Sequence, residues 1–144
     1  PNFTAEDQKF EIGKAVILTE GSDVTIAATG HLVWQALEAA QALASEGISA
    51  EVINFHTIKP LDEEALLNSI GKTGCLVSAE EHQKFGGLGE SLAGVLSQKQ
   101  PTPQEYVAVN DSFGESGKPA DLLVKYGLDA KNIVAAAKRA LERK

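Results

Sequence analysis

The three histidines of the chain each follow an apolar segment, and acidic residues accompany one of them. His31, His56 and His82 occupy these positions, and Glu80 and Glu81 directly precede His82. Imidazole titrates near neutral pH and, when neutral, ligates zinc. Such a set could bind a metal ion or exchange protons with a substrate. The spacing is not that of a metal-ligand motif, however, and polar residues are common in loops after strands, where they cap helices or bond to the backbone.

A glycine-rich segment at residues 86–89, Gly-Gly-Leu-Gly, opens a predicted helix after a predicted strand. Backbone amides at a helix N-terminus can hold a phosphate group. The segment does not match the dinucleotide-binding fingerprint, because Leu92 stands where the last glycine should be. We favour the structural interpretation, in which these glycines let the helix turn sharply and pack close to the sheet.

Two residues beyond the last predicted strand extend this set. Asp111 adds a carboxylate, and Phe113 stands in the polar segment 112–119, where an aromatic side chain is unusual. We expect Phe113 to anchor against a partner surface. The candidate residues for a ligand site or an interface are therefore Gly30, His31, His56, Glu80, Glu81, His82, Gly86, Gly87, Asp111 and Phe113. None of them is assigned as catalytic, cofactor-binding or metal-ligating.

Apolar segments alternate with amphipathic ones along the chain. Strands are predicted at residues 14–19, 23–29, 49–55, 75–79 and 106–109. Helices are predicted at residues 32–46, from Asp62 as N-cap, at 87–98, at 119–126 with an end at Gly127, and from Asp129 as the cap of a final helix. Strands that alternate with helices are joined by right-handed crossovers into a parallel sheet between two helical layers.

The first two strands are too close in sequence for such a crossover, so the first should run antiparallel at or near an edge of the sheet. The predicted fold is therefore α/β: a three-layer αβα sandwich with a five-stranded mixed sheet, four strands parallel and one antiparallel. Ligands bind such sheets at the carboxyl ends of the strands. The candidate residues should lie at that edge.

Length and composition indicate one domain, residues 1–144, with residues 1–12 as a lead-in segment. The net charge of −7 argues against nucleic acid and membrane surfaces as partners. No apolar run reaches the length of a membrane span, and the first ten residues lack a secretion signal. The single cysteine, Cys75, favours a reducing compartment. We expect a cytoplasmic protein, whether Pro1 begins a natural product or marks a cut in a longer chain.

Several motifs in order resemble the C-terminal domain of the transketolase family. They are the segments 12–15 (IGKA), 20–26 (EGSDVTI), 56–62 (HTIKPLD) and 80–82 (EEH) with 86–89 (GGLG). This domain is shared by transketolase, 1-deoxyxylulose-5-phosphate synthase and the beta subunits of 2-oxo acid dehydrogenases. The segment 116–119 (SGKP), followed by LLVKYGL at 122–128, favours transketolase itself, including versions made as two polypeptides.

The resemblance implies a five-stranded fold of the predicted kind and a role in an assembled enzyme. Transketolases transfer a two-carbon ketol unit between sugar phosphates, using thiamine diphosphate and a divalent metal such as Mg²⁺, in the pentose phosphate pathway. The implied partners are the N-terminal cofactor-binding and pyrimidine-binding domains or subunit, in a homodimeric assembly. The family's G-D-G and paired-asparagine motif has no match in this chain. No catalytic residue is therefore carried over, and the isolated chain is predicted to be inactive and to bind no cofactor.

Three functions follow from these observations. The first, which we adopt, is a non-catalytic structural domain or subunit of a transketolase; the equivalent domain of the two related enzymes is its close alternative. The second is a regulatory module that binds a small anion or nucleotide at the strand ends. The third is an independent enzyme that uses the histidines.

Overall fold

Five strands form one mixed sheet in the computed structural model. The structure describes residues 12–82, 86–109 and 119–144; for His31 and residues 119–126 it describes the backbone alone. The strands are β1 (Val16–Thr19), β2 (Val24–Ala28), β3 (Ala50–Asn54), β4 (Leu76–Glu81) and β5 (Gln104–Val109). Their order in the sheet is β1-β3-β2-β4-β5. β1 is antiparallel to β3, and the other neighbours are parallel. The predicted sheet, with one antiparallel strand at an edge, is confirmed.

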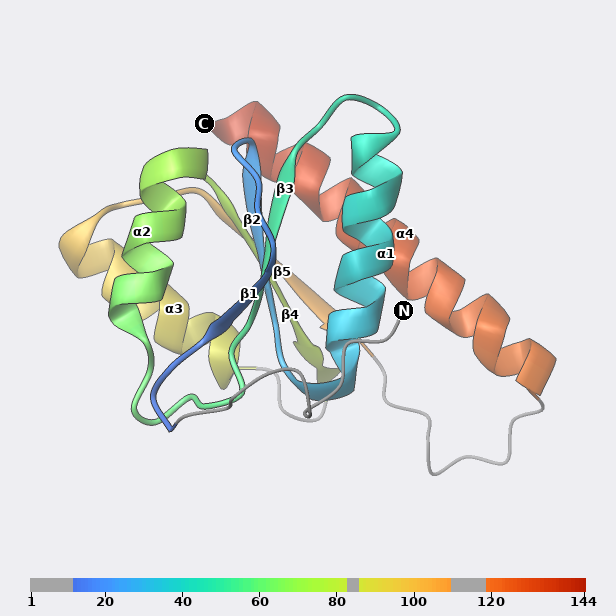
Figure 1. Ribbon diagram of the computed structural model, residues 1–144, viewed down its shortest axis with the longest axis horizontal. Helices are drawn as coiled ribbons and strands as arrows, with labels where there is room; N and C mark the ends of the chain where they lie inside the picture. Colours follow the sequence, from blue (N-terminus) through green and yellow to red (C-terminus); the bar gives the residue numbers. More distant parts are fainter. Residues whose placement is uncertain (1–11, 83–85, 110–118) are drawn as a thin grey trace.

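Helices cover both faces of the sheet and complete the three predicted layers (Figure 1). They are α1 (Val33–Ala44), α2 (Glu63–Thr73), α3 (Leu88–Lys99) and α4 (Pro119–Arg143), with the short 3-10 helix η1 (Gly30–Leu32) before α1. Helices α1 and α4 lie on one face, and α2 and α3 on the other. Strand β2 is buried along its whole length, as its continuous apolar sequence predicts. Within the described part of the chain, no helix is both long and apolar enough to cross a membrane.

The start of α2 shows how local sequence sets an element boundary. Asp62 is the N-cap, as predicted, and its Oδ1 accepts a hydrogen bond of 3.1 Å from the amide of Ala65. Its Oδ2 accepts a second bond, of 2.8 Å, from the amide of Ala15. One carboxylate therefore begins the helix and also fastens the start of the described chain to the loop after β3.

The two helices predicted at the C-terminus are wrong, because α4 is a single helix of 25 residues. Gly127, the expected end of the first helix, lies inside it, and Asp129, the expected cap, is buried within it. Downstream residues of α4, among them Ile133 and Ala137, are fully buried in the core that α4 shares with α1. Interior glycine costs a helix only about 1 kcal/mol. The packing of the apolar face therefore outweighs the glycine.

The predicted ends of two neighbouring strands also differ from the structure. β4 extends to Glu81 rather than residue 79, and β5 begins at Gln104 rather than Tyr106. The two strands pair in parallel from Leu76 with Gln104 to Glu81 with Val109. The cross-strand pairing extends both elements beyond their apolar segments, so the acidic end of β4 belongs to the strand and not to a loop.

The connections create a crevice at the carboxyl edge of the sheet. The helix that follows β2 is α1, and the helix that follows the adjacent β4 is α3; these helices lie on opposite faces. Neighbouring parallel strands whose connections leave in opposite directions form a topological switch point, where α/β sheets commonly bind ligands. The ends of β2 and β4 are therefore the place to look for a site.

Candidate functional site at the carboxyl edge of the sheet

A pocket of about 260 Å³ lies at this switch point. Its lining comes from the ends of β2, β3 and β4 and consists of Thr29, Gly30, Phe55, His56, Ile58 and Glu80. Phe55 is 1% exposed and belongs to the core between the sheet, α2 and α3. The structure thus brings together three of the candidate residues, Gly30, His56 and Glu80, around an aromatic and aliphatic base.

Glu80 is committed to the start of α3. Its side chain is buried, and Oε1 accepts a hydrogen bond of 3.0 Å from the amide of Leu88. Oε2 accepts a second bond of 2.8 Å from the amide of Gly89. These are the amides that the glycine-rich segment offered as a phosphate cradle. Because a carboxylate of the same chain already occupies them, an added anion would meet negative charge and find no donor there.

The glycine-rich segment is explained by close packing. A Cβ on Gly89 would lie 2.7 Å from two ring carbons of Tyr106 and 2.9 Å from Oε2 of Glu80. The carbonyl of Gly89 also accepts a 3.0 Å hydrogen bond from Nε2 of Gln104 on β5. Gly86 has a positive φ of 100°, which favours glycine. Helix α3 can approach the sheet this closely only because residue 89 has no side chain.

Negative charge accumulates around this contact. Burial, with the nearby carboxylates of Glu90 and Glu80 adding to it, raises the pKa of Tyr106. The Tyr106 hydroxyl therefore stays neutral across the physiological range and does not serve as a base. The polar groups at the start of α3 stabilise the fold and are poorly suited to bind a phosphate.

The histidines are in different surroundings. His56 is half-buried, and its Nδ1 lies 3.2 Å from Oγ1 of Thr57. His82 is exposed immediately after β4, and His31 belongs to η1, with its side chain outside the description. Glu81 is half-buried at the end of β4. In the ranges that the structure covers, no group of three or more His, Cys, Asp and Glu side chains is arranged to hold a metal ion.

The remaining candidates have separate outcomes. Gly87 is the N-cap position of α3, with a negative φ of −77°. Asp111 and Phe113 lie outside the described residues, so their predicted roles stay predictions.

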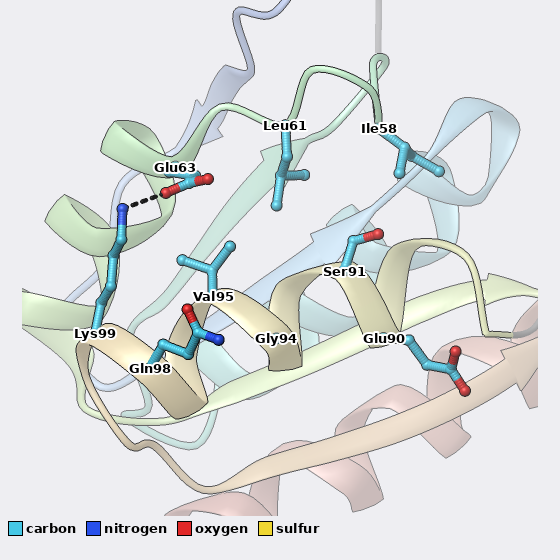
Figure 2. A pocket seen from close by; sticks show the side chains of 9 residues that line it. All are labelled: Ile58, Leu61, Glu63, Glu90, Ser91, Gly94, Val95, Gln98 and Lys99. Carbon is cyan, nitrogen blue, oxygen red and sulfur yellow. Dashed lines mark hydrogen bonds and ion pairs between the residues drawn. The ribbon is translucent and has the colours of Figure 1, made fainter.

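Sequence reasoning missed a larger hollow on the other side of Ile58. This hollow, the α2–α3 groove, has a volume of about 540 Å³ and lies between α3, the start of α2 and the loop before it (Figure 2). Its apolar lining is Ile58, Leu61 and Val95. The signal in the sequence is slight: Ser91 and Gly94 place two small residues on the side of α3 that lines the groove.

The fold and this edge define a class of protein: a three-layer α/β domain with one antiparallel edge strand, in which the amides at the start of α3 bind the domain's own carboxylate. Residues 13–133 match the family described as "Transketolase, C-terminal domain". The chain belongs to this family, and the resemblance found in the sequence is confirmed.

Proteins similar to this chain are longer than it and are described as transketolases or related enzymes. A 6-deoxy-6-sulfo-D-fructose transketolase subunit, SqwH, from Clostridium sp. (strain MSTE9) is 51% identical over 140 residues, which are 97% of this chain and 44% of that protein. A solved structure described as "Split gene transketolase, inactive beta4 tetramer" is 48% identical, with a TM-score of 0.83 over 99% of this chain and 46% of that one. 1-Deoxy-D-xylulose-5-phosphate synthase 1 from Geobacter sulfurreducens is 40% identical, over 96% of this chain and 22% of that enzyme. The chain therefore spans less than half the length of these relatives.

Proposed function

We propose that the chain is the non-catalytic C-terminal domain of a thiamine-diphosphate-dependent transketolase, which transfers two-carbon ketol units between sugar phosphates. The observation that carries the proposal is the match itself. Nearly the whole chain matches less than half of the length of each transketolase subunit, and the matching family is described as the transketolase C-terminal domain. In this role the domain supports the assembled enzyme, and the chemistry takes place in its partner domains.

The residues at the carboxyl edge do not fit the cofactor. A diphosphate requires donors or a bound cation, but the amides at the start of α3 already bind the carboxylate of Glu80. The adjacent pocket, about 260 Å³, is smaller than typical cofactor pockets of roughly 300–1,000 Å³. No step of the reaction is therefore assigned to this chain. The proposal assigns thiamine diphosphate and Mg²⁺ to the N-terminal cofactor-binding and pyrimidine-binding domains, because the family's G-D-G and paired-asparagine motif has no match in this chain.

The proposal extends to the organisation of the protein. The 144 residues form one domain with residues 1–12 as its lead-in segment, and the enzyme is a cytoplasmic homodimer of the pentose phosphate pathway. Burial of both faces of the sheet, in two separate apolar cores, supports folding of the domain as one unit.

Thermal unfolding with and without the cofactor tests the proposal directly. Thiamine diphosphate with Mg²⁺ should leave the melting temperature of the isolated chain unchanged. A true ligand at 100 times its Kd stabilises a protein by about 2.7 kcal/mol, which corresponds to several degrees. A saturable rise would contradict the proposal. Ketose phosphate turnover should require the cofactor-binding partner, and turnover by the chain alone would instead support an independent enzyme.

A second candidate, a regulatory site for a small molecule, is favoured by one observation. The pocket beside Gly30 and His56 lies at the topological switch point of the sheet. Calorimetric titration with nucleotides and sugar phosphates tests this function. The absence of a measurable heat of binding for every compound would contradict this second function. The carboxylate of Glu80 already disfavours the anionic compounds.

A further inference from the structure

We infer that the α2–α3 groove is the surface on which the preceding domain of the same enzyme docks. The surface consists of Ile58, Leu61 and Val95 in the groove, Glu90 at its edge, and the adjacent Ile12 and Pro60. The inference rests on the proposed function, because it requires the partner domains of a transketolase.

The groove presents apolar side chains that the domain itself only half covers. Leu61 from the loop and Val95 from α3 point toward one another across it, and Ile58 lies at the same end as the start of α3 (Figure 2). All three pack on the core between the sheet, α2 and α3 and are half-buried. A partner that covered them would remove further apolar surface from water, over a core that is already buried.

The chain reaches this surface directly from its N-terminal side. The amide of Ala15 donates a 2.8 Å hydrogen bond to Asp62, and a Cβ on Gly13 would lie 3.2 Å from Cγ of Pro60. The first described residues therefore run along the loop that forms one wall of the groove. Ile12, which leads into this contact, is 85% exposed and adds apolar surface beside the groove.

The additional length of the relatives indicates which partner would occupy the surface. This chain covers 44% of the Clostridium subunit and 46% of the split transketolase chain, and its family is their C-terminal domain. In those relatives the remaining part precedes the family domain, and in this chain Gly13 and Ala15, near the start of the described residues, lie beside the loop that borders the groove. The preceding domain is thus tethered beside the groove, which favours it over a second copy of the chain.

Charge further specifies the contact. Glu63 at one end of the groove is paired with Lys99 at 2.6 Å. Glu90, at the start of α3, is exposed and forms no ion pair with any other residue in the described ranges. Its side chain points away from Leu61 and Val95 (Figure 2), so it lies at the edge of the surface. The partner surface should therefore present apolar side chains to Leu61 and Val95 and a lysine or arginine to Glu90.

Residue-level footprinting with a carbene or hydroxyl radicals tests the inference, by comparing the 144-residue chain with the assembled enzyme that contains it. Labelling of Ile12, Ile58, Leu61 and Val95 should fall severalfold on assembly. Trp34 and Leu37 line a separate hollow on α1 and provide the control, since their labelling should not change. Protection on α1 without protection in the groove would overturn the inference and leave the proposed function intact.

Two further outcomes separate the alternatives. Groove protection that appears in the chain alone and grows with its concentration would assign the surface to a second copy and overturn the inference. Failure of the chain to assemble with any cofactor-binding part would instead overturn the proposed function, and the inference with it.

A pair of charge variants tests the contact at Glu90. Glu90→Lys should weaken the groove protection in the assembled enzyme. Glu142→Lys, which makes the same charge change at an exposed position near the end of α4, should keep all of it. Equal protection in the two variants would overturn the predicted charge pairing, whereas a selective loss in Glu90→Lys would support it.

Discussion

Replacing Glu80 with glutamine should destabilise the domain by removing the charge that binds the start of α3. The two hydrogen bonds, 3.0 Å to Leu88 and 2.8 Å to Gly89, join a buried carboxylate to backbone amides. The amide of Glu80→Gln can accept one of these bonds, but its NH₂ group faces the second N–H and leaves that donor unsatisfied. A buried unsatisfied group costs about 1–3 kcal/mol. Loss of the favourable charge at a helix N-terminus costs up to about 2 kcal/mol more. We expect a total loss of roughly 2–3 kcal/mol in the free energy of unfolding.

Urea unfolding followed by circular dichroism measures this loss. The midpoint should fall while the m-value stays constant, because the surface exposed on unfolding is unchanged. Glu142→Gln is the matched control: its side chain is exposed on α4, and its effect should stay within about 0.5 kcal/mol. If Glu80→Gln were as stable as this control, the carboxylate would not hold α3, and the explanation of the glycine-rich segment would fail.

The Glu80→Ala variant provides a second readout with a different cause. Removing the carboxylate frees the amides of Leu88 and Gly89, which can then donate hydrogen bonds to an external anion. Added phosphate should therefore raise the melting temperature of Glu80→Ala more than that of the unmodified chain. An equal effect on both proteins would show that Glu80 does not occupy an anion-binding position.

Three further predictions concern the packing, charge and thiol of the domain. Gly89→Ala should destabilise the domain by about 1–3 kcal/mol, because its Cβ would lie 2.7 Å from the Tyr106 ring. Gly94→Ala, whose Cβ would have no atom within 4 Å, should stabilise the domain by about 0.5–1 kcal/mol, because alanine favours a helix more than glycine does. Urea unfolding of the two variants measures both changes. Hydrogen bonds from Arg139 and Arg143 of α4 hold the pKa of the Glu105 carboxyl below its ordinary value of 4.5. The ionised carboxylate therefore stabilises the fold above that pH, and this contribution is lost as the pH falls through the lowered pKa. Glu105→Gln should accordingly be less stable than the parent at pH 7 and indistinguishable from it in acid, as measured by melting temperature against pH. Burial raises the pKa of Cys75, so a thiol reagent should react with it slowly in the folded chain and rapidly in urea; fast reaction without urea would contradict the buried position.

The layers and the sheet followed from the sequence because they depend on patterns within short segments. The continuous apolar run of β2 predicts a strand buried on both faces, and the amphipathic segments predict helices that cover the sheet. The close spacing of β1 and β2 excluded a crossover, which correctly placed the antiparallel strand at the edge. The Asp62 cap was likewise readable, since an N-cap contacts residues only three positions away.

Elements whose boundaries depend on distant partners were predicted less well. The predicted break at Gly127 followed local propensity, but the buried face of α4 carries the helix through it. The end of β4 at residue 79 followed the apolar pattern, but pairing with β5 carries the strand through Glu80 and Glu81. In both cases a contact with a distant segment contributes more free energy than the local preference does.

For the candidate site, the sequence alone determined which edge of the sheet would collect the polar residues, because parallel strands all end on the same side. It also determined the family, through the order of its motifs. Only the tertiary structure decided what those residues do: it joined Glu80 to the amides of α3, separated His82 from the pocket beside His56, and left the α2–α3 groove open near Ile12. These outcomes depend on distances between elements that are far apart in sequence, which residue order by itself does not specify.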